Sequence, residues 1–257
     1  METRIYLRHD DGHDLTAEIF RPEAGTDPLP CLGFFHGGGW ANGSPTEFHA
    51  ICAWFAARGY LTISFAYRLC PQPRPEVRDR PSITPLECSL DARAALRWLH
   101  VEADALGIDR DRIVLGGQSA GGQLALATVL ADAIDPAGPI RPMPRGFLLY
   151  SSNHNTVESW ADALFNERRD ELPPISPFHT LVPGMPPICS FHGGKDSMVA
   201  PYVVDFFRRR TEALGNRYDL HRFPERGHYL GDPDRTYATL VDEDILERSA
   251  TFLAGIL

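Results

Sequence analysis

The segment Ile113–Leu130, IVLGGQSAGGQLALATVL, joins a short β-branched apolar run to an alanine- and leucine-rich run that favours a helix. One serine, Ser119, stands between the two runs, with two glycines before it and two after it. The motif GQSAG at residues 117–121 predicts a tight turn from strand to helix that lifts the serine hydroxyl above the sheet. Free N–H groups at the helix N-terminus favour negative charge at such a corner. Ser119 is therefore a candidate nucleophile.

A glycine-rich turn between a strand and a helix can also hold a dinucleotide. That spacing fails in this chain, because Gln118 and Ser119 stand where the second glycine of the dinucleotide motif is needed. The lysine of a nucleotide-binding P-loop is also missing from the turn. The sequence therefore favours the nucleophile turn.

Length and composition limit the classes of protein to consider. The chain has 257 residues, 43% hydrophobic and 23% charged, which predicts one α/β domain over residues 1–257. Its net charge of -9 argues against nucleic acid or an anionic membrane as a partner. Five scattered cysteines without a CxxC motif argue against a disulfide framework or a zinc site.

No leader-like segment opens the chain, and no apolar run reaches membrane-spanning length. We therefore expect a soluble, cytoplasmic protein, with secretion left open for a chain that has lost a leader. A homodimer is also left open.

Apolar runs alternate with helical patterns along most of the chain. We expect the first two strands to form an antiparallel hairpin, and residues 86–106 to form one long helix. The pattern predicts a mostly parallel eight-stranded sheet with helices on both faces. The expected strands are Arg4–His9, Leu15–Phe20, Cys31–Phe35, Leu61–Tyr67, Arg112–Gly116, Arg145–Ser151, Pro187–His192 and Tyr218–Phe223.

A second glycine-rich turn follows the expected strand Cys31–Phe35, in the sequence FFHGGGW. Consecutive glycines expose backbone N–H groups, so Gly38 and Gly39 are candidate donors to an oxyanion, with the Ala120 N–H as a third. A plain flexible turn is the alternative, but Trp40 and His36 at its ends favour a shaped loop, which His36 would brace by hydrogen bonding.

An acid and a base are expected after the serine in chain order. Asp196 follows the expected strand that ends at His192, and His228 follows the expected strand that ends at Phe223. Because parallel strands end at the same sheet edge, both side chains should lie beside Ser119. Other candidates fit less well: His221 lies inside a strand, Asp205 lies inside a helix and His192 precedes the acid.

Four motifs together, HGGGW, GQSAGG, HGGKDSMV and RGHYL, resemble the α/β-hydrolase superfamily. YRLCPQP and DARAALRWL are similar to the hormone-sensitive lipase-like branch and to its acetylxylan and feruloyl esterase-like relatives. The resemblance implies an α/β-hydrolase fold, with Ser119 as nucleophile, His228 as base and Asp196 as orienting acid. It implies no metal and no other cofactor.

The chain departs from the hormone-sensitive lipase-like pattern in two ways. Gln118 stands where an acidic residue is usual, and strand-like sequence begins near Arg4, where those proteins carry a helical cap. We therefore expect a reduced cap. Residues 152–186, with Trp160, Phe165 and Phe178, could form a small lid, and an ordinary excursion with a structural aromatic cluster is an equal alternative.

The expected activity is hydrolysis of short-chain acyl esters, with acetylated or feruloylated sugars as candidate substrates. The candidate substrate contacts are Trp40, Gln118 and Tyr229. An amide hydrolase, such as a formamidase or a peptidase-like enzyme, is the nearest alternative, and a non-catalytic ligand receptor on the same fold is a more distant one.

Overall fold

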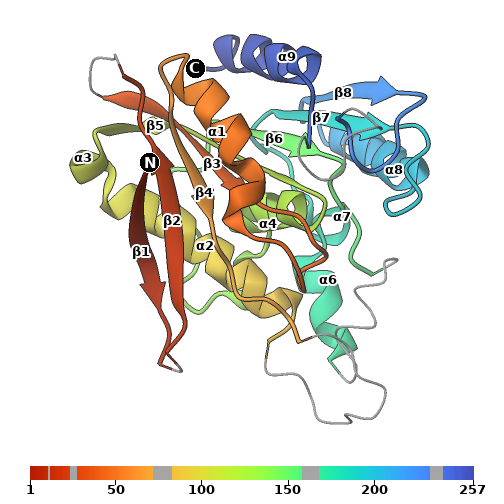
Figure 1. Cartoon of the computed structure of the whole chain (residues 1–257). Coiled ribbons are helices and arrows are strands. Elements are labelled where there is room, and N and C mark those ends of the chain that lie inside the picture. The colour runs from red at the N-terminus through yellow and green to blue at the C-terminus, as the bar shows by residue number, and fades with distance from the viewer. Residues whose placement is uncertain (11, 24–27, 72–82, 158–167, 232–239) are drawn as a thin grey trace.

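One sheet organises the computed structural model, which describes residues 1–10, 12–23, 28–71, 83–157, 168–231 and 240–257. Within these residues the sheet has eight strands in the order β1-β2-β4-β3-β5-β6-β7-β8 (Figure 1). The mostly parallel eight-stranded sheet expected from the sequence is therefore confirmed. The strands are β1 (Glu2–Arg8), β2 (Asp14–Phe20), β3 (Leu29–Phe35), β4 (Leu61–Phe65), β5 (Ile108–Gln118), β6 (Gly146–Tyr150), β7 (Ile188–Gly193) and β8 (Tyr218–Phe223).

The direction of each strand follows from what connects it to the next. β1 and β2 pair antiparallel, as the absence of a helix between them predicts, and β2 pairs antiparallel with β4. The six strands from β3 to β8 all run parallel, because helices connect each of them to the next along the chain. The carboxyl ends of β3, β5, β7 and β8 therefore meet at one edge, where the sequence places its candidate catalytic residues.

Helices cover both faces of the sheet (Figure 1). α1 and α9 pack on one face, and α2, α4 and α8 pack on the other. Alternate side chains of a strand point to opposite faces of the sheet. In β3, Leu32 and Phe34 belong to the core under α1. Cys31 and Phe35 belong to the core under α4. The α-helices are α1 (His49–Ala56), α2 (Pro85–Val101), α3 (Ala103–Leu106), α4 (Ala120–Leu130), α6 (Leu172–Ile175), α7 (Pro177–Thr180), α8 (Pro201–Ala213) and α9 (Glu243–Ala254).

Three short 3₁₀ helices complete the described elements: η1 (Pro45–Phe48), η2 (Asp132–Ile134) and η3 (Arg169–Glu171). η1 leads directly into α1, and it begins with a capping interaction in which the Ser44 N–H donates to Glu47 Oε1 over 3.3 Å. This contact places the Glu47 carboxylate close to the sheet edge that carries the candidate site.

The single helix expected over residues 86–106 is wrong in detail, because two helices occupy this stretch. α2 ends at Val101, and Glu102 takes a backbone conformation outside the helical range, with φ -88° and ψ 5°. The short α3 then ends at Gly107 with φ 70°, in the left-handed region that glycine adopts easily. Apolar spacing continued across this break, so the hydrophobic pattern alone did not reveal it.

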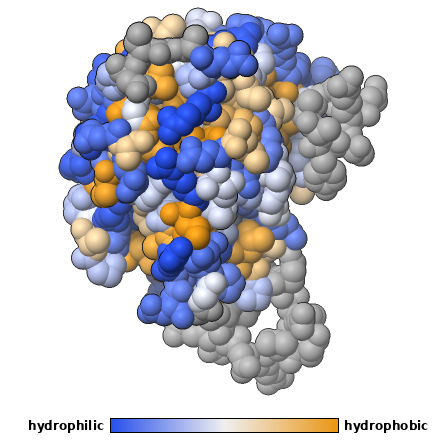
Figure 2. All heavy atoms as spheres, turned by 60° about the vertical axis from the view of Figure 1, so that its left-hand side comes forward, coloured by the Kyte–Doolittle hydropathy of each residue, from blue (hydrophilic) through white to orange (hydrophobic). Residues whose placement is uncertain are grey.

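Charged side chains protect the open edge of the sheet at β1. Glu2, Arg4 and Arg8 lie along this strand, and Arg4 forms an ion pair with Glu2 at 2.5 Å. Figure 2 brings this side of the molecule forward and shows hydrophilic and hydrophobic residues interspersed across it. Charges on an edge strand oppose pairing with a further strand.

Within the described residues, no helix is both long and apolar enough to pass through a bilayer.

The described part of residues 152–186 packs against α4. Gln123 on α4 donates its side-chain Nε2 to the Ile175 backbone oxygen over 2.8 Å, which fixes α6 to this helix. Trp160 and Phe165 lie outside the described residues, so the lid stays a prediction, as does the single-domain organisation. Phe178 lies on α7, with the Arg210 guanidinium over its ring at 5.1 Å.

Candidate active site

Ser119 lies at a strained corner between β5 and α4. Its φ of 54° and ψ of -118° are unusual for a residue with a side chain, and such strain costs about 1–3 kcal/mol. Neighbouring backbone holds the corner in place: the Ser119 N–H donates to the Tyr150 oxygen, and the Ser119 oxygen accepts from the N–H groups of Asn153 and Gly122. The predicted turn is therefore present, and Ser119 immediately precedes the first turn of α4.

The glycines around Ser119 allow strand and helix to approach closely. A Cβ atom on Gly117 would lie 2.4 Å from the backbone of Gly121, and one on Gly121 would lie 2.0 Å from the Phe35 oxygen. A Cβ on Gly122 would lie 2.4 Å from Ser152 Oγ. All three separations are far below van der Waals contact, so each of these positions requires glycine.

The loop after β3 presents backbone donors to the same edge. Gly38 and Gly39 have φ of 102° and 61°, in the left-handed region that glycine adopts easily. The Gly38 oxygen accepts from the N–H groups of Ala41 and Asn42, at 3.2 and 2.9 Å, which closes the loop. In the part of the chain that the structure describes, the N–H groups of Gly38, Gly39 and Ala120 donate to no protein acceptor.

His36 and Tyr67 support this loop from beneath. The His36 imidazole is buried, stacks on Tyr67 with ring centroids 4.3 Å apart, and donates Nδ1–H to the Gly37 oxygen over 2.8 Å. The Tyr67 hydroxyl donates to the His36 and Gly37 oxygens at 3.0 and 3.1 Å. Burial lowers the pKa of His36 to about 4, so its imidazole is neutral at neutral pH. His36 therefore braces the loop, as the sequence suggested.

The structure does not bring Trp40 to the pocket, although the sequence suggested a substrate contact. Its side chain is fully buried, and the indole N–H donates to Gln123 Oε1 on α4 over 2.9 Å. Its φ of 61° turns the ring inward, which anchors the glycine loop to the helix that follows Ser119. Trp40 is a support of the loop in this arrangement.

Asp196 and His228 contact each other directly. His228 Nδ1 lies 2.8 Å from Asp196 Oδ2, and both side chains are buried. Asp196 Oδ1 accepts the backbone N–H groups of Met198 and Val199, each at 2.9 Å, so the carboxylate is fixed in orientation. Burial opposes ionisation of Asp196, but hydrogen bonds and nearby charge, chiefly from His228, outweigh it and lower the pKa of this carboxyl.

A second histidine supports Asp196, and the sequence did not identify this role. His192 Nε2 donates to the Val199 oxygen over 2.9 Å and lies 3.4 Å from Asp196 Oδ2. Burial lowers the pKa of His192 despite the neighbouring carboxylate, which favours its neutral form. His192 thus holds the turn that carries Asp196. The only sequence signal for it was its position at the end of a buried strand.

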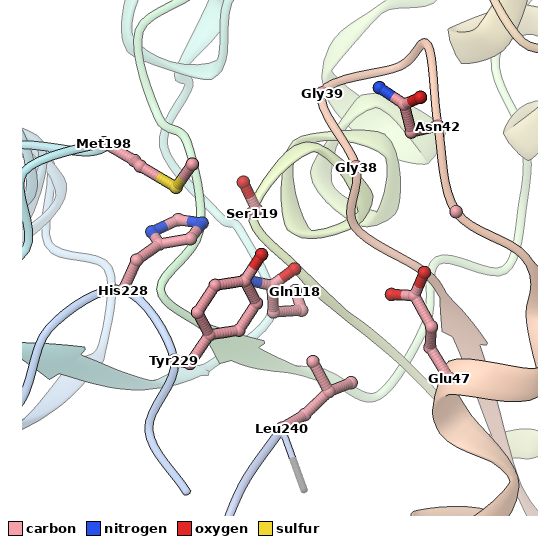
Figure 3. A pocket seen from close by; sticks show the side chains of 11 residues that line it. Gly38, Gly39, Asn42, Glu47, Gln118, Ser119, Met198, His228, Tyr229 and Leu240 are labelled. Carbon is pink, nitrogen blue, oxygen red and sulfur yellow. The ribbon is translucent and has the colours of Figure 1, made fainter. Parts of the chain in front are cut away.

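These parts surround one pocket of about 420 Å³, within the usual range for small-molecule sites. Figure 3 shows the Ser119 hydroxyl and the His228 imidazole beside each other, with Gly38 and Gly39 on the adjoining loop. The pocket therefore contains Ser119, His228, two of the three predicted oxyanion donors, and the predicted contacts Gln118 and Tyr229. Its other lining residues, which the sequence did not identify, are Asn42, Gly43, Glu47, Met198 and Leu240.

Within the described residues, no group of three or more His, Cys, Asp or Glu side chains is arranged to hold a metal ion. The arrangement that is present suits nucleophilic catalysis: a serine at a strained corner, a histidine oriented by a carboxylate, and backbone donors at a helix N-terminus.

The fold agrees with the comparison to known families. Residues 32–230 match a family described as having the alpha/beta hydrolase fold. This match covers more than half of the chain, so the chain belongs to the α/β-hydrolase family.

Among characterised proteins, the chain is similar to the ethyl acetate hydrolase of Pseudomonas putida, with 38% identity over 135 residues. That match covers 51% of this chain and 38% of the relative. It is also similar to esterase LipC of Mycobacterium tuberculosis, with 28% identity over 247 residues, 88% of this chain and 59% of the relative. The chain thus spans only part of the length of these two relatives.

The similarity to solved structures extends over nearly the whole chain. Esterase 2 of Thermogutta terrifontis, phosphoramylated by tabun, is 30% identical, with a TM-score of 0.84 over 99% of this chain and 94% of that one. The same esterase with propionate bound is 29% identical, also with a TM-score of 0.84 and the same coverage. The solved structures that resemble this fold therefore include an esterase.

Proposed function

We propose that this protein is a serine carboxylesterase that hydrolyses short-chain acyl esters. The observation that supports this most is the contact between Asp196 and His228 at the pocket where Ser119 occupies its strained corner. The names of the relatives point the same way, since one is an ethyl acetate hydrolase and another is an esterase.

In the proposed first step, His228 takes the proton from Ser119 Oγ while the oxygen attacks the ester carbonyl carbon. The carbonyl oxygen becomes an oxyanion that accepts from the N–H groups of Gly38, Gly39 and Ala120. Each such donor contributes roughly 10²–10³ in rate. The bond from carbon to the alcohol oxygen then breaks, and His228 returns its proton to the departing alcohol.

In the second step, water replaces the alcohol. The water oxygen attacks the acyl-serine carbonyl carbon while His228 takes a proton from the water. This proton then passes to Ser119 Oγ as the carboxylic acid leaves. Asp196 accepts from Nδ1–H of His228 throughout, which fixes the imidazole tautomer and stabilises its charged form.

The size of the pocket favours short acyl groups. A volume of about 420 Å³ must hold the acyl group and the reacting centre together. The relative from Thermogutta terrifontis has been solved with propionate and with butyrate, which are short acids of the corresponding kind. Among saccharide esters, acetylated sugars fit this proposal more easily than feruloylated sugars, whose acyl group is larger.

The test is hydrolysis of p-nitrophenyl acetate, propionate, butyrate and octanoate by the wild-type protein and by Ser119→Ala. We expect turnover that declines with acyl length, and a loss of about 10⁴–10⁶ in kcat for the variant. Thr251→Ala, which removes an exposed hydroxyl on α9, serves as the matched control and should keep full activity. A Ser119→Ala variant with activity near wild type would contradict the proposal.

A further inference from the structure

The pocket has two chemically different sides. Met198 lies on the same side of Ser119 as His228, while Asn42 and Glu47 lie on the opposite side (Figure 3). Gln118 lies beneath Ser119, between these two sides, and lines the same pocket, so the side with Asn42 and Glu47 and the floor beside it are polar. A purely alkyl acyl group requires no such polar lining.

Gln118 carries the first part of the argument. Its side chain is buried, and within the described residues its Nε2 has no hydrogen-bond partner. The other amide atom, Oε1, lies against the glycine loop, where a Cβ on Gly37 would be only 1.8 Å away. A buried amide N–H₂ without an acceptor costs about 1–3 kcal/mol, and a ligand oxygen within hydrogen-bond reach of Nε2 would remove that cost.

Glu47 carries the second part. One oxygen, Oε1, accepts the Ser44 N–H, which leaves the carboxylate able to accept a further donor from the pocket. A Cβ on Gly43 would lie 2.7 Å from Glu47 Oε1 and 2.7 Å from the Gly37 oxygen. Glu47 and Gln118 therefore pack on the same glycine turn. Burial raises the pKa of Glu47 and outweighs the opposite effect of the hydrogen bond from the Ser44 N–H.

The proposed chemistry indicates which part of an ester lies on the Glu47 side of the pocket. The alcohol oxygen must lie beside His228 to receive its proton, and the carbonyl oxygen must face Gly38, Gly39 and the start of α4. The acyl chain is the remaining substituent on the carbonyl carbon. It therefore extends to the side opposite His228, where Figure 3 shows Glu47.

We propose that Gln118 and Glu47 form a subsite for a hydroxyl group on the acyl chain, so that short hydroxyacyl esters are the preferred substrates. This inference rests on the proposed esterase function. A hydroxyl can accept from Gln118 Nε2 and donate to Glu47 at the same time. An ammonium group can only donate, so it leaves the Gln118 amide N–H₂ without an acceptor. An alkyl group leaves the Gln118 amide N–H₂ without an acceptor and offers Glu47 no donor beyond the Ser44 N–H, and sites of this kind reject such analogues strongly.

The test compares esters that differ only in a hydroxyl and a methyl group. One pair is p-nitrophenyl 3-hydroxybutyrate and 3-methylbutyrate, and the other is p-nitrophenyl 2-hydroxypropanoate and 2-methylpropanoate. The readout is the ratio of kcat/KM within each pair. We expect at least one ratio to exceed about 10 in the wild-type protein. Ratios of 1 or less in both pairs would overturn the subsite.

Two variants then assign the preference to its residues. Gln118→Met and Glu47→Met keep the length of the side chains but remove their hydrogen-bonding atoms, and each should lower the favoured ratio roughly fivefold to tenfold. Glu212→Met makes the same chemical change on the exposed surface of α8 and should leave the ratio unchanged. Because the ratio is taken within one protein, a general loss of activity does not change it. A ratio that stays at the wild-type value in both folded variants would contradict the assignment.

The result also separates the subsite from the esterase function. If both members of each pair are hydrolysed at equal rates, the proposed subsite is excluded and the esterase function is retained. If the folded protein hydrolyses neither the four esters nor p-nitrophenyl acetate, the esterase function is excluded, and the subsite with it.

Discussion

His228 and Asp196 join two loops that lie 32 residues apart in sequence, with His228 Nδ1 2.8 Å from Asp196 Oδ2. The second carboxylate oxygen is held by the N–H groups of Met198 and Val199. The imidazole therefore contacts an acceptor that cannot rotate away, and this orientation is the basis of the first prediction.

Asp196→Asn should lower kcat about 10³–10⁴-fold for short esters, with little change in KM. The asparagine oxygen can still accept the two backbone N–H groups, but the amide N–H₂ facing His228 favours the wrong imidazole tautomer. Asp205→Asn, on the exposed side of α8, should keep near-wild-type kcat. Kinetics on p-nitrophenyl acetate provide the measurement, and an Asp196→Asn variant with more than a tenth of wild-type kcat would exclude the orienting role.

Gly121→Ala should destabilise the protein by at least ~2 kcal/mol and remove most of its activity. The new Cβ would lie 2.0 Å from the Phe35 oxygen and 2.4 Å from the His36 oxygen, so β3 and α4 would have to separate. Gly255→Ala is the matched control, because its Cβ would meet nothing nearer than 3.4 Å. Urea unfolding of both variants checks this, and equal unfolding free energies would show that the close approach is not required.

Acid should destabilise the protein through two buried histidines. Burial lowers the pKa of His36 to about 4 and that of His154 to about 3, both below the 6.5 of an exposed histidine. The unfolded chain therefore binds protons below about pH 6.5 that the folded chain does not bind. Stability is complete above that pH and falls as the pH drops toward 4, by about 2 kcal/mol per histidine between pH 7 and pH 5.

Urea unfolding at pH 7 and at pH 5 measures this fall in the free energy of unfolding. His154→Gln removes one of the two groups, so its loss of stability between the two pH values should be smaller by about 2 kcal/mol. The absolute stability of the variant does not enter the comparison. A variant with the same pH dependence as wild type would rule out His154 as a source of the acid sensitivity.

The sheet could be predicted because apolar runs mark its buried strands. β8 has the predicted bounds, and β7 differs by one residue at each end. β5 was predicted to begin at Arg112 but begins at Ile108, because its first half is the polar run Asp109–Arg112. An ion pair between Asp109 and Arg112, 2.8 Å apart, and pairing of Ile108 with Leu29 stabilise that extension, and neither interaction is visible in a hydrophobic pattern.

The site could be predicted where local sequence and strand order determine position. Ser119, Asp196 and His228 each follow a strand of the parallel sheet, so they share an edge. Side-chain direction within a loop could not be predicted in the same way. The inward turn of Trp40 depends on its positive φ and on an acceptor 83 residues away, Gln123.

The remaining lining residues come from distant segments that carry no catalytic motif. Glu47 belongs to η1, where its carboxylate accepts the Ser44 N–H at the start of the helix. Met198 and Leu240 reach the pocket from loops after β7 and before α9. Their roles depend on tertiary arrangement, so a single sequence contains no local signal for them.

The central claim, that Ser119 is the nucleophile, is tested most directly by labelling with a fluorophosphonate probe followed by peptide mapping. The account predicts one label per chain, on Ser119, and labelling at least 10²-fold slower in Asp196→Asn because His228 is then misoriented. A label on a different residue, or an active protein that remains unlabelled, would contradict it.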